Sequence, residues 1–199
     1  MDKGRLLLFL GVFVLELLIF FGATVVPIGP AAQQQVQQAA KELQNSTAHQ
    51  PPAAVLGFIF SNNVKVALAE LIPGAGAVVF FISMVNTGQV IQAIGLSTGV
   101  PAALLGSLLF AFPFTIVELS AYALAVCSGS MLIIAWRRKR LHREARVFAY
   151  EAVGVVLILL IAATMETITL FSYEIGFALW LPTGLLVAWL AITLRRTFG

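Results

Sequence analysis

Long apolar runs, separated by short clusters of basic residues, constrain the fold of this chain more than any other sequence feature. The run from Leu6 to about Val26 is long enough to cross a bilayer as a helix, which takes about 20 apolar residues. Hydrophobic residues make up 60% of the chain and charged residues 11%, against about 25% charged residues in soluble domains. A soluble fold of this size could not bury so much apolar surface. The sequence therefore predicts an all-α, polytopic membrane protein whose solvent is the lipid bilayer.

The apolar runs predict about six transmembrane helices, some of them broken by proline or glycine. The predicted spans are residues 6–26, 64–84, 90–112, 115–136, 147–171 and 177–194. Residues 53–60 are apolar but too short to span, and we expect them to lie along the membrane surface. Pro73 should bend the second span, Pro101 should make the third broken or re-entrant, and Pro113 should form the corner before the fourth. Asn86-Thr87-Gly88 is expected to mark a turn after the second span.

The basic residues predict how the chain is oriented in the cell membrane. They form three clusters: Lys3 with Arg5, the linker 137–146, and Arg195 with Arg196. Cytoplasmic loops carry an excess of Lys and Arg. Six crossings that start from a cytoplasmic amino terminus bring all three clusters, and the carboxyl terminus, to the cytoplasmic side. We therefore expect residues 1–199 to form one multi-pass membrane domain, with the linker 137–146 in the cytoplasm.

The polar segment 29–52 is expected to lie outside the cell. Its stretch 31–43 contains good helix formers with little hydrophobicity, which predicts a solvated helix. Asn45-Ser46-Thr47 matches a glycosylation acceptor, a triplet that also occurs often by chance. The segment is the clearest surface in the sequence for a protein partner on the outer face.

Four glutamates lie inside the apolar runs: Glu16, Glu70, Glu118 and Glu166. A charge at the bilayer centre costs at least about 3 kcal/mol. The predicted topology puts the last three at a similar depth near the outer side, where they would form a polar pocket or a site for a cation or proton. Alternatively, each glutamate is protonated or hydrogen-bonded to a neighbouring helix and only locks the packing. Glu16 is expected to pair helices rather than to join the site.

Asparagines beside the second predicted span complete the set of candidate functional residues. Asn62 and Asn63 precede this span and Asn86 follows it, so they either cap helix ends or serve a functional site. Lys65 is expected to reach the outer interface with its long side chain. Small residues allow close helix approach in a tight bundle or in a homo-oligomer: Ala67, Gly74, Gly76, Ala102, Gly106 and Gly129.

The sequence contains no group of residues that predicts catalysis, and we expect neither a cofactor nor a metal. His49 and His142 are the only histidines, and they fall in different loops on opposite sides of the predicted membrane, so no His-based triad or metal site can form within it. Asp2 is the only aspartate, which excludes an aspartyl pair, and the single Cys127 lacks partners for a disulfide or metal site. Basic residues lie in the gaps between apolar runs, so nucleic-acid binding is not expected.

Three stretches of the chain form a further pattern: residues 58–69 (FIFSNNVKVALA), Asn86-Thr87-Gly88, and residues 113–121 (PFTIVELSA). Together they resemble the stage II sporulation protein M family of membrane proteins. The family has a paired Asn before a span, an Asn-Gly element after it, and then a proline and a histidine followed one turn later by a glutamate. Glu118 matches that glutamate, whereas Phe114 and Thr115 replace the histidine and the glycine after it. The resemblance covers about residues 53–196 and implies a six-helix membrane protein.

Two functions from different classes follow from these features. In endospore-forming bacteria the family member holds cell-wall hydrolases at the engulfing septum. The resemblance thus implies a non-enzymatic membrane scaffold that anchors a partner through residues 29–63 and the outer ends of the spans. The broken segments and the intramembrane glutamates favour instead a transporter or channel for ions, protons or small solutes.

Overall fold

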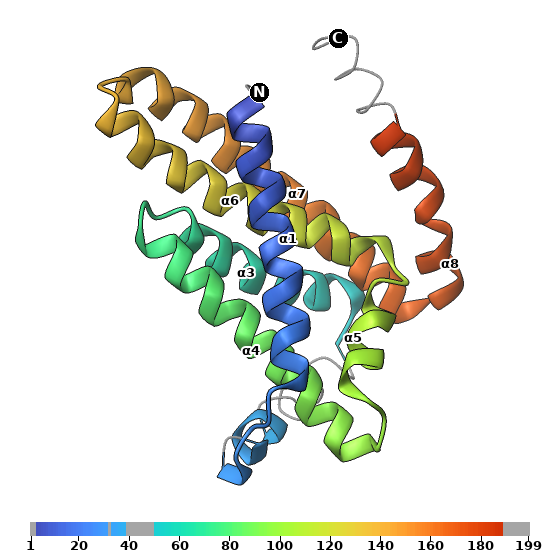
Figure 1. Ribbon diagram of the computed structural model, residues 1–199. Coiled ribbons are helices and arrows are strands. Elements are labelled where there is room, and N and C mark those ends of the chain that lie inside the picture. The colour runs from blue at the N-terminus through green and yellow to red at the C-terminus, as the bar shows by residue number, and fades with distance from the viewer. Residues whose placement is uncertain (1–2, 32, 39–49, 189–199) are drawn as a thin grey trace.

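The computed structural model describes residues 3–31, 33–38 and 50–188, and within them the chain is almost entirely helical with no strand (Figure 1). The helices are α1 (Lys3–Val25), α3 (Pro52–Glu70), α4 (Ala75–Thr98), α5 (Ala102–Leu109), α6 (Pro113–Arg137), α7 (Leu141–Phe171) and α8 (Tyr173–Ala178). Residues 30–31 and 33–38 are also helical, as predicted for that part of 31–43. The Asn45-Ser46-Thr47 triplet, His49 and the end of the sixth predicted span lie outside the described residues.

Among the described residues, α1, α3, α4, α6 and α7 are long and apolar enough to cross a membrane. A shorter apolar helix, Tyr173–Ala188, follows them and includes α8. The prediction of an all-α polytopic membrane protein is confirmed. At 31 residues, α7 extends about 46 Å and so projects beyond a hydrocarbon core about 30 Å thick.

The prediction of one span over residues 64–84 is wrong, because these residues are divided between two helices, α3 and α4. Residues 53–60, expected on the membrane surface, form the first half of α3. The chain then reverses through residues 71–74, and α4 runs back beside α3 (Figure 1). Pro73 therefore lies in a turn between helices rather than in a bend. Gly74 has a φ of +83°, which a residue with a Cβ rarely adopts, so the helix ends here instead of continuing.

The turn expected at Asn86-Thr87-Gly88 is also wrong, because α4 continues through these residues. Gly88 serves a close helix contact instead. A Cβ at this position would lie 2.6 Å from the carbonyl oxygen of Phe20, so its absence lets α4 approach the backbone of α1.

The predicted third span, 90–112, is wrong as a crossing segment, although it is broken as expected at Pro101. Helix α4 ends at Thr98, and α5 has only eight residues, about 12 Å, which is too short to cross. Pro113 begins α6, as predicted from its position at the corner. Since α3 and α4 are separate helices, each long enough to cross, four described helices of that length precede the linker 137–146, which equals the predicted number of spans.

The bundle has two distinct ends (Figure 1). The amino terminus, the α3–α4 turn and the α6–α7 connection lie at one end, which we call the basic end because it carries Arg5 and the linker 137–146. The segment between α1 and α3 and the α4–α5 connection lie at the opposite end. The core lies along α6, where Ala121, Ala125 and Gly129 leave room for neighbouring helices. A Cβ on Gly129 would lie 2.7 Å from the carbonyl oxygen of Leu71.

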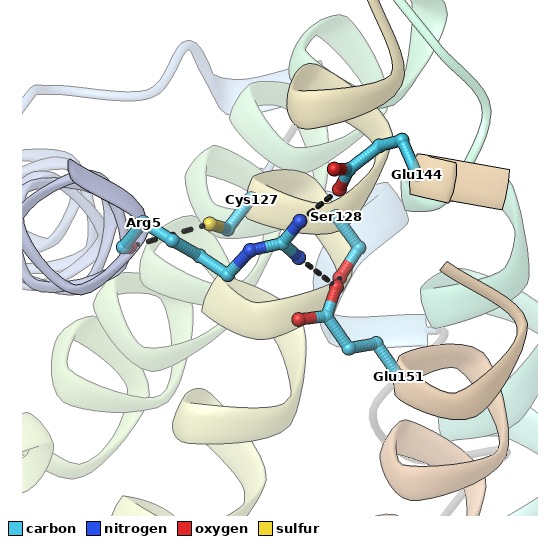
Figure 2. A network of polar contacts seen from close by, with 5 residues as sticks. All are labelled: Arg5, Cys127, Ser128, Glu144 and Glu151. Carbon is cyan, nitrogen blue, oxygen red and sulfur yellow. Dashed lines mark hydrogen bonds and ion pairs between the residues drawn. The ribbon is translucent and has the colours of Figure 1, made fainter. Parts of the chain in front are cut away.

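An ionic network joins three helices at the basic end (Figure 2). The guanidinium of Arg5, 5% exposed on α1, pairs with both Glu144 and Glu151 of α7. The hydroxyl of Ser128 on α6 donates to Oε2 of Glu151 at 2.6 Å. The thiol of Cys127 lies 3.7 Å from the carbonyl oxygen of Arg5. These contacts fix the start of α1 against α6 and α7.

Replacing Gly129 by Ala should destabilise the protein by about 1–3 kcal/mol, because the new methyl group overlaps the end of α3. Gly154→Ala is the matched control in the middle of α7, where a Cβ meets nothing within 4 Å. We expect the control to be neutral or slightly stabilising, since Ala favours helix. Thermal unfolding of both variants in detergent measures the difference. Equal melting temperatures would contradict this contact.

Replacing Arg5 by Met should cost about 3–5 kcal/mol, because it leaves two partly buried carboxylates without their cation. Lys3→Met removes an exposed charge nearby and should have little effect. Adding Glu144→Gln and Glu151→Gln to Arg5→Met should restore part of the lost stability. Thermal unfolding of the four proteins tests this, and an Arg5→Met variant as stable as Lys3→Met would rule out a stabilising network.

Candidate functional site

A cavity of about 270 Å³ with both polar and apolar lining residues lies inside the bundle, and α1, α3, α4, α5, α6 and α7 all contribute to it. The helices present it with amide, hydroxyl and carboxyl groups: Asn62, Asn63, Ser83, Thr87, Thr115, Glu118, Tyr122 and Glu166. The residues of α6 that line the cavity all lie in the first three turns of that helix, and Glu166 lies near the end of α7. The cavity is therefore nearer the end of the bundle opposite the basic end.

Two carboxyl groups from different helices face this cavity. On α6, the hydroxyl of Tyr122 donates to Oε1 of Glu118 at 2.9 Å, which fixes the orientation of that carboxyl. Tyr122 is itself buried, so its ring is held by the core. Glu166 enters from α7 and lies close enough to Glu118 for their charges to interact. Two like charges in a confined space repel each other unless a proton or a cation intervenes.

Two adjacent amides of α3 complete the polar wall. Asn63 is buried, whereas Asn62 is exposed and therefore lies at the margin of the cavity. The side-chain nitrogen of Asn62 donates to Oδ1 of Asn63 at 3.5 Å. Both residues occupy the interior of α3, so the alternative that they cap a helix end is wrong. Their position in mid-helix puts both amides on the cavity that the two carboxyl groups also line.

These side chains offer mainly oxygen atoms to a ligand. Carboxylate and amide oxygens bind hard cations, and the same groups accept hydrogen bonds from ammonium or hydroxyl groups. In the part of the chain that the structure describes, no three His, Cys, Asp or Glu side chains are grouped so as to hold a metal ion. The oxygen atoms that line the cavity can accept a cation, a proton or a small polar solute.

Glu70 lies in a different place from the one its position in the sequence predicted. Helix α3 runs toward the basic end and Glu70 is its last residue, so the expected shared depth with Glu118 and Glu166 is wrong. Glu70 is fully buried near Glu16, which sequence reasoning left out of the site. Among the described residues, neither carboxyl has a hydrogen-bond partner. Glu16 also lies within electrostatic range of Glu118. The pair of Glu16 and Glu70 is therefore electrostatically linked to the pair of Glu118 and Glu166.

Two further predicted positions lie away from the cavity. Asn86 is exposed on α4 and does not line it, whereas its neighbour Thr87 does. Lys65 is exposed on α3, five residues from the helix end at the basic end, so its expected place near the opposite interface is wrong. The correction for Lys65 follows from the reversal at residues 71–74, which sets the direction of α3, whereas Asn86 lies on an exposed face of α4.

Sequence reasoning missed several residues that the cavity uses. Tyr122 follows Glu118 by four residues, and Thr87 follows Ser83 by four, so each pair shares one helix face. That spacing was a usable signal for Tyr122. Phe20 also lines the cavity, but the sequence does not predict this. Residue type alone cannot separate it from the many other apolar residues of α1.

The three stretches that carried the resemblance come together at this cavity. Asn62 and Asn63 belong to the first, Thr87 to the second, and Glu118 to the third. Phe114, which stands where the family pattern has a histidine, lines the same cavity. Positions separate in sequence are thus adjacent in the folded bundle.

Comparison with known protein families gives one match, and searches of curated proteins and of solved structures found none. The family model described as stage II sporulation protein M matches residues 6–169. This range extends the resemblance to α1, including Glu16, and stops before α8. It covers well over half of the chain and all of the residues that line the cavity. The chain therefore belongs to the stage II sporulation protein M family.

Proposed function

We propose that this protein is a transporter or channel for a small cation or proton, with the cavity of about 270 Å³ as its binding site. The observation that supports this function best is that Glu118 and Glu166 meet the two asparagines of α3 in one cavity. If the glutamates served only packing, each would be expected in a separate helix contact with its own hydrogen-bond donor. The convergence of two carboxyl groups in one cavity favours a positively charged ligand.

The cost of burying these groups supports the same interpretation. A carboxylate inside the membrane costs at least about 3 kcal/mol, and intramembrane acids commonly mark ion pathways or proton relays. Tyr122 connects to Glu118, and the buried Glu16 and Glu70 continue the series of polar groups toward the basic end. Such a series gives a cation or proton successive positions along the bundle.

The orientation is part of the proposal. We infer a cytoplasmic location for the amino terminus and the linker 137–146, because basic residues concentrate in both, and for the carboxyl terminus because its sequence contains Arg195 and Arg196. The cavity then lies in the outer half of the cell membrane, and the segment between α1 and α3 lies outside the cell.

A non-enzymatic scaffold is the second candidate function. Most of the described residues of 29–38 are exposed at the end of the bundle opposite the basic end, where they are available to a protein partner (Figure 1). The description of the family as a sporulation protein is compatible with such an anchoring role. This candidate places the partner surface outside the membrane and gives the cavity no part in it.

Glu118→Gln and Glu166→Gln should each lower cation binding or flux about 10- to 100-fold, because each removes a charge-assisted contact worth about 1.5–3 kcal/mol. Glu174→Gln is the matched control, since Glu174 is exposed on α8 and lies outside the cavity. The measurement is flux of protons, monovalent and divalent cations, and small solutes in vesicles carrying purified protein. A wild type without flux for any of them, or a control that loses as much as the cavity variants, would refute the transport proposal.

Replacing residues 31–50 with a glycine-serine linker of equal length tests the scaffold candidate. The equal length keeps α1 and α3 connected over the same distance, and thermal unfolding in detergent checks that the bundle is intact. A scaffold should lose its partners in a detergent pull-down after this change, whereas Glu118→Gln should retain them. Unchanged partner recovery from the linker variant would argue against this docking surface.

A further inference from the structure

A second cavity, of about 430 Å³, lies at the basic end of the bundle between α1, α6 and α7. Three exposed arginines of the α6–α7 connection and the start of α7 line it: Arg138, Arg140 and Arg143. Apolar side chains also line it, including Met131, Ile134 and Val147. The cavity therefore combines strongly basic residues with apolar ones. The transport and scaffold proposals make no use of it.

The charges on this cavity do not cancel. Four arginines and two glutamates line it, which leaves a net charge of +2. Both glutamates, Glu144 and Glu151, are already paired with the buried Arg5 (Figure 2). Among the side chains that the structure describes, no carboxylate lies within ion-pair distance of the three exposed arginines. Their guanidinium groups are thus available to an anion.

The backbone of the connection helps to set this geometry. Lys139 has a φ of +56°, and the amide of Arg140 donates back to the carbonyl oxygen of Ala135 at 2.9 Å. The tight turn places Arg138 and Arg140 on the same cavity as Arg143 of the first turn of α7. Helix α7 begins there without a side-chain cap, so its amino-terminal amides add to the positive potential.

We propose that this cavity binds a phosphate group carried by an anionic phospholipid. Guanidinium groups bind phosphate oxygens in bidentate fashion, and basic pockets between transmembrane helices at the cytoplasmic side receive anionic headgroups. The apolar residues that line the same cavity suit the acyl chains of a lipid and offer nothing to free phosphate. The bound headgroup would brace the junction where Arg5 already joins α1 to α7.

The test compares two triple variants with the same loss of charge. The cavity variant is Arg138→Gln, Arg140→Gln and Arg143→Gln. The control variant is Arg137→Gln, Lys139→Gln and Arg146→Gln, whose exposed side chains come from the same linker but do not line the cavity. Purified full-length protein in neutral detergent is titrated with short-chain phosphatidylglycerol, short-chain phosphatidylcholine and inorganic phosphate. Calorimetry reports binding, and thermal unfolding checks that each variant is folded.

The wild type and the control variant should bind phosphatidylglycerol more tightly than phosphatidylcholine. The cavity variant should bind it on the order of a hundredfold more weakly, because each arginine contributes roughly a factor of five near an anionic group. A third variant with lysine at the three cavity positions should bind with intermediate affinity, since it keeps the charge but not the bidentate geometry.

Three results would overturn the proposal. Equal losses in the cavity and control variants would show that the charge of the linker acts without a defined site. Inorganic phosphate binding as tightly as phosphatidylglycerol would assign the cavity to free phosphate rather than to a lipid. Absence of binding by the folded wild type to any of the three probes would exclude a phosphate site.

Discussion

Hydrocarbon cannot solvate a charge or a free backbone amide, and the rest of this structure follows from that constraint. Helices satisfy their own backbone groups, so the chain crosses as helices, and its polar side chains must be buried against other helices. Burying these side chains requires close packing of the helices, and glycine allows it because it has no side chain. Gly88 and Gly129 let α1 and α3 approach the backbones of α4 and α6, respectively. The polar groups are then held inside a bundle whose outer surface is apolar.

The glutamates show how the partner, rather than the residue type, decides the role of a carboxyl group. Glu144 and Glu151 share the cation Arg5, and Ser128 adds a hydrogen bond to Glu151, so both carboxylates have partners and they fasten helices together. Glu118 and Glu166 face a cavity and each other, with a tyrosine hydroxyl on one of them. The first arrangement stabilises the fold, whereas the second leaves binding capacity for a positively charged ligand.

Membership of the stage II sporulation protein M family fixes the kind of protein but not its activity. The structure adds that the stretches typical of the family meet at one cavity in the outer half of the proposed topology. Phe114 replaces a histidine there, so this chain lines the cavity with an aromatic wall where the family pattern supplies a titratable group. In the function proposed above, Glu118, Glu166 and the asparagines would recognise the ligand without that histidine.

The sequence by itself determined the all-helical membrane fold, the number of apolar segments long enough to cross before the basic linker, and the presence of glutamates that need burial. These follow from hydropathy and charge, which are properties of each segment alone. Only the tertiary structure decided that residues 71–74 reverse the chain, because a Pro-Gly pair permits either a bend or a turn, and the packing partners of α3 select between them. That choice sets the direction of α3, and with it the depth of Glu70 and Lys65. It also decides which side chains face the cavity, since a helix can be rotated or reversed without any change in its composition.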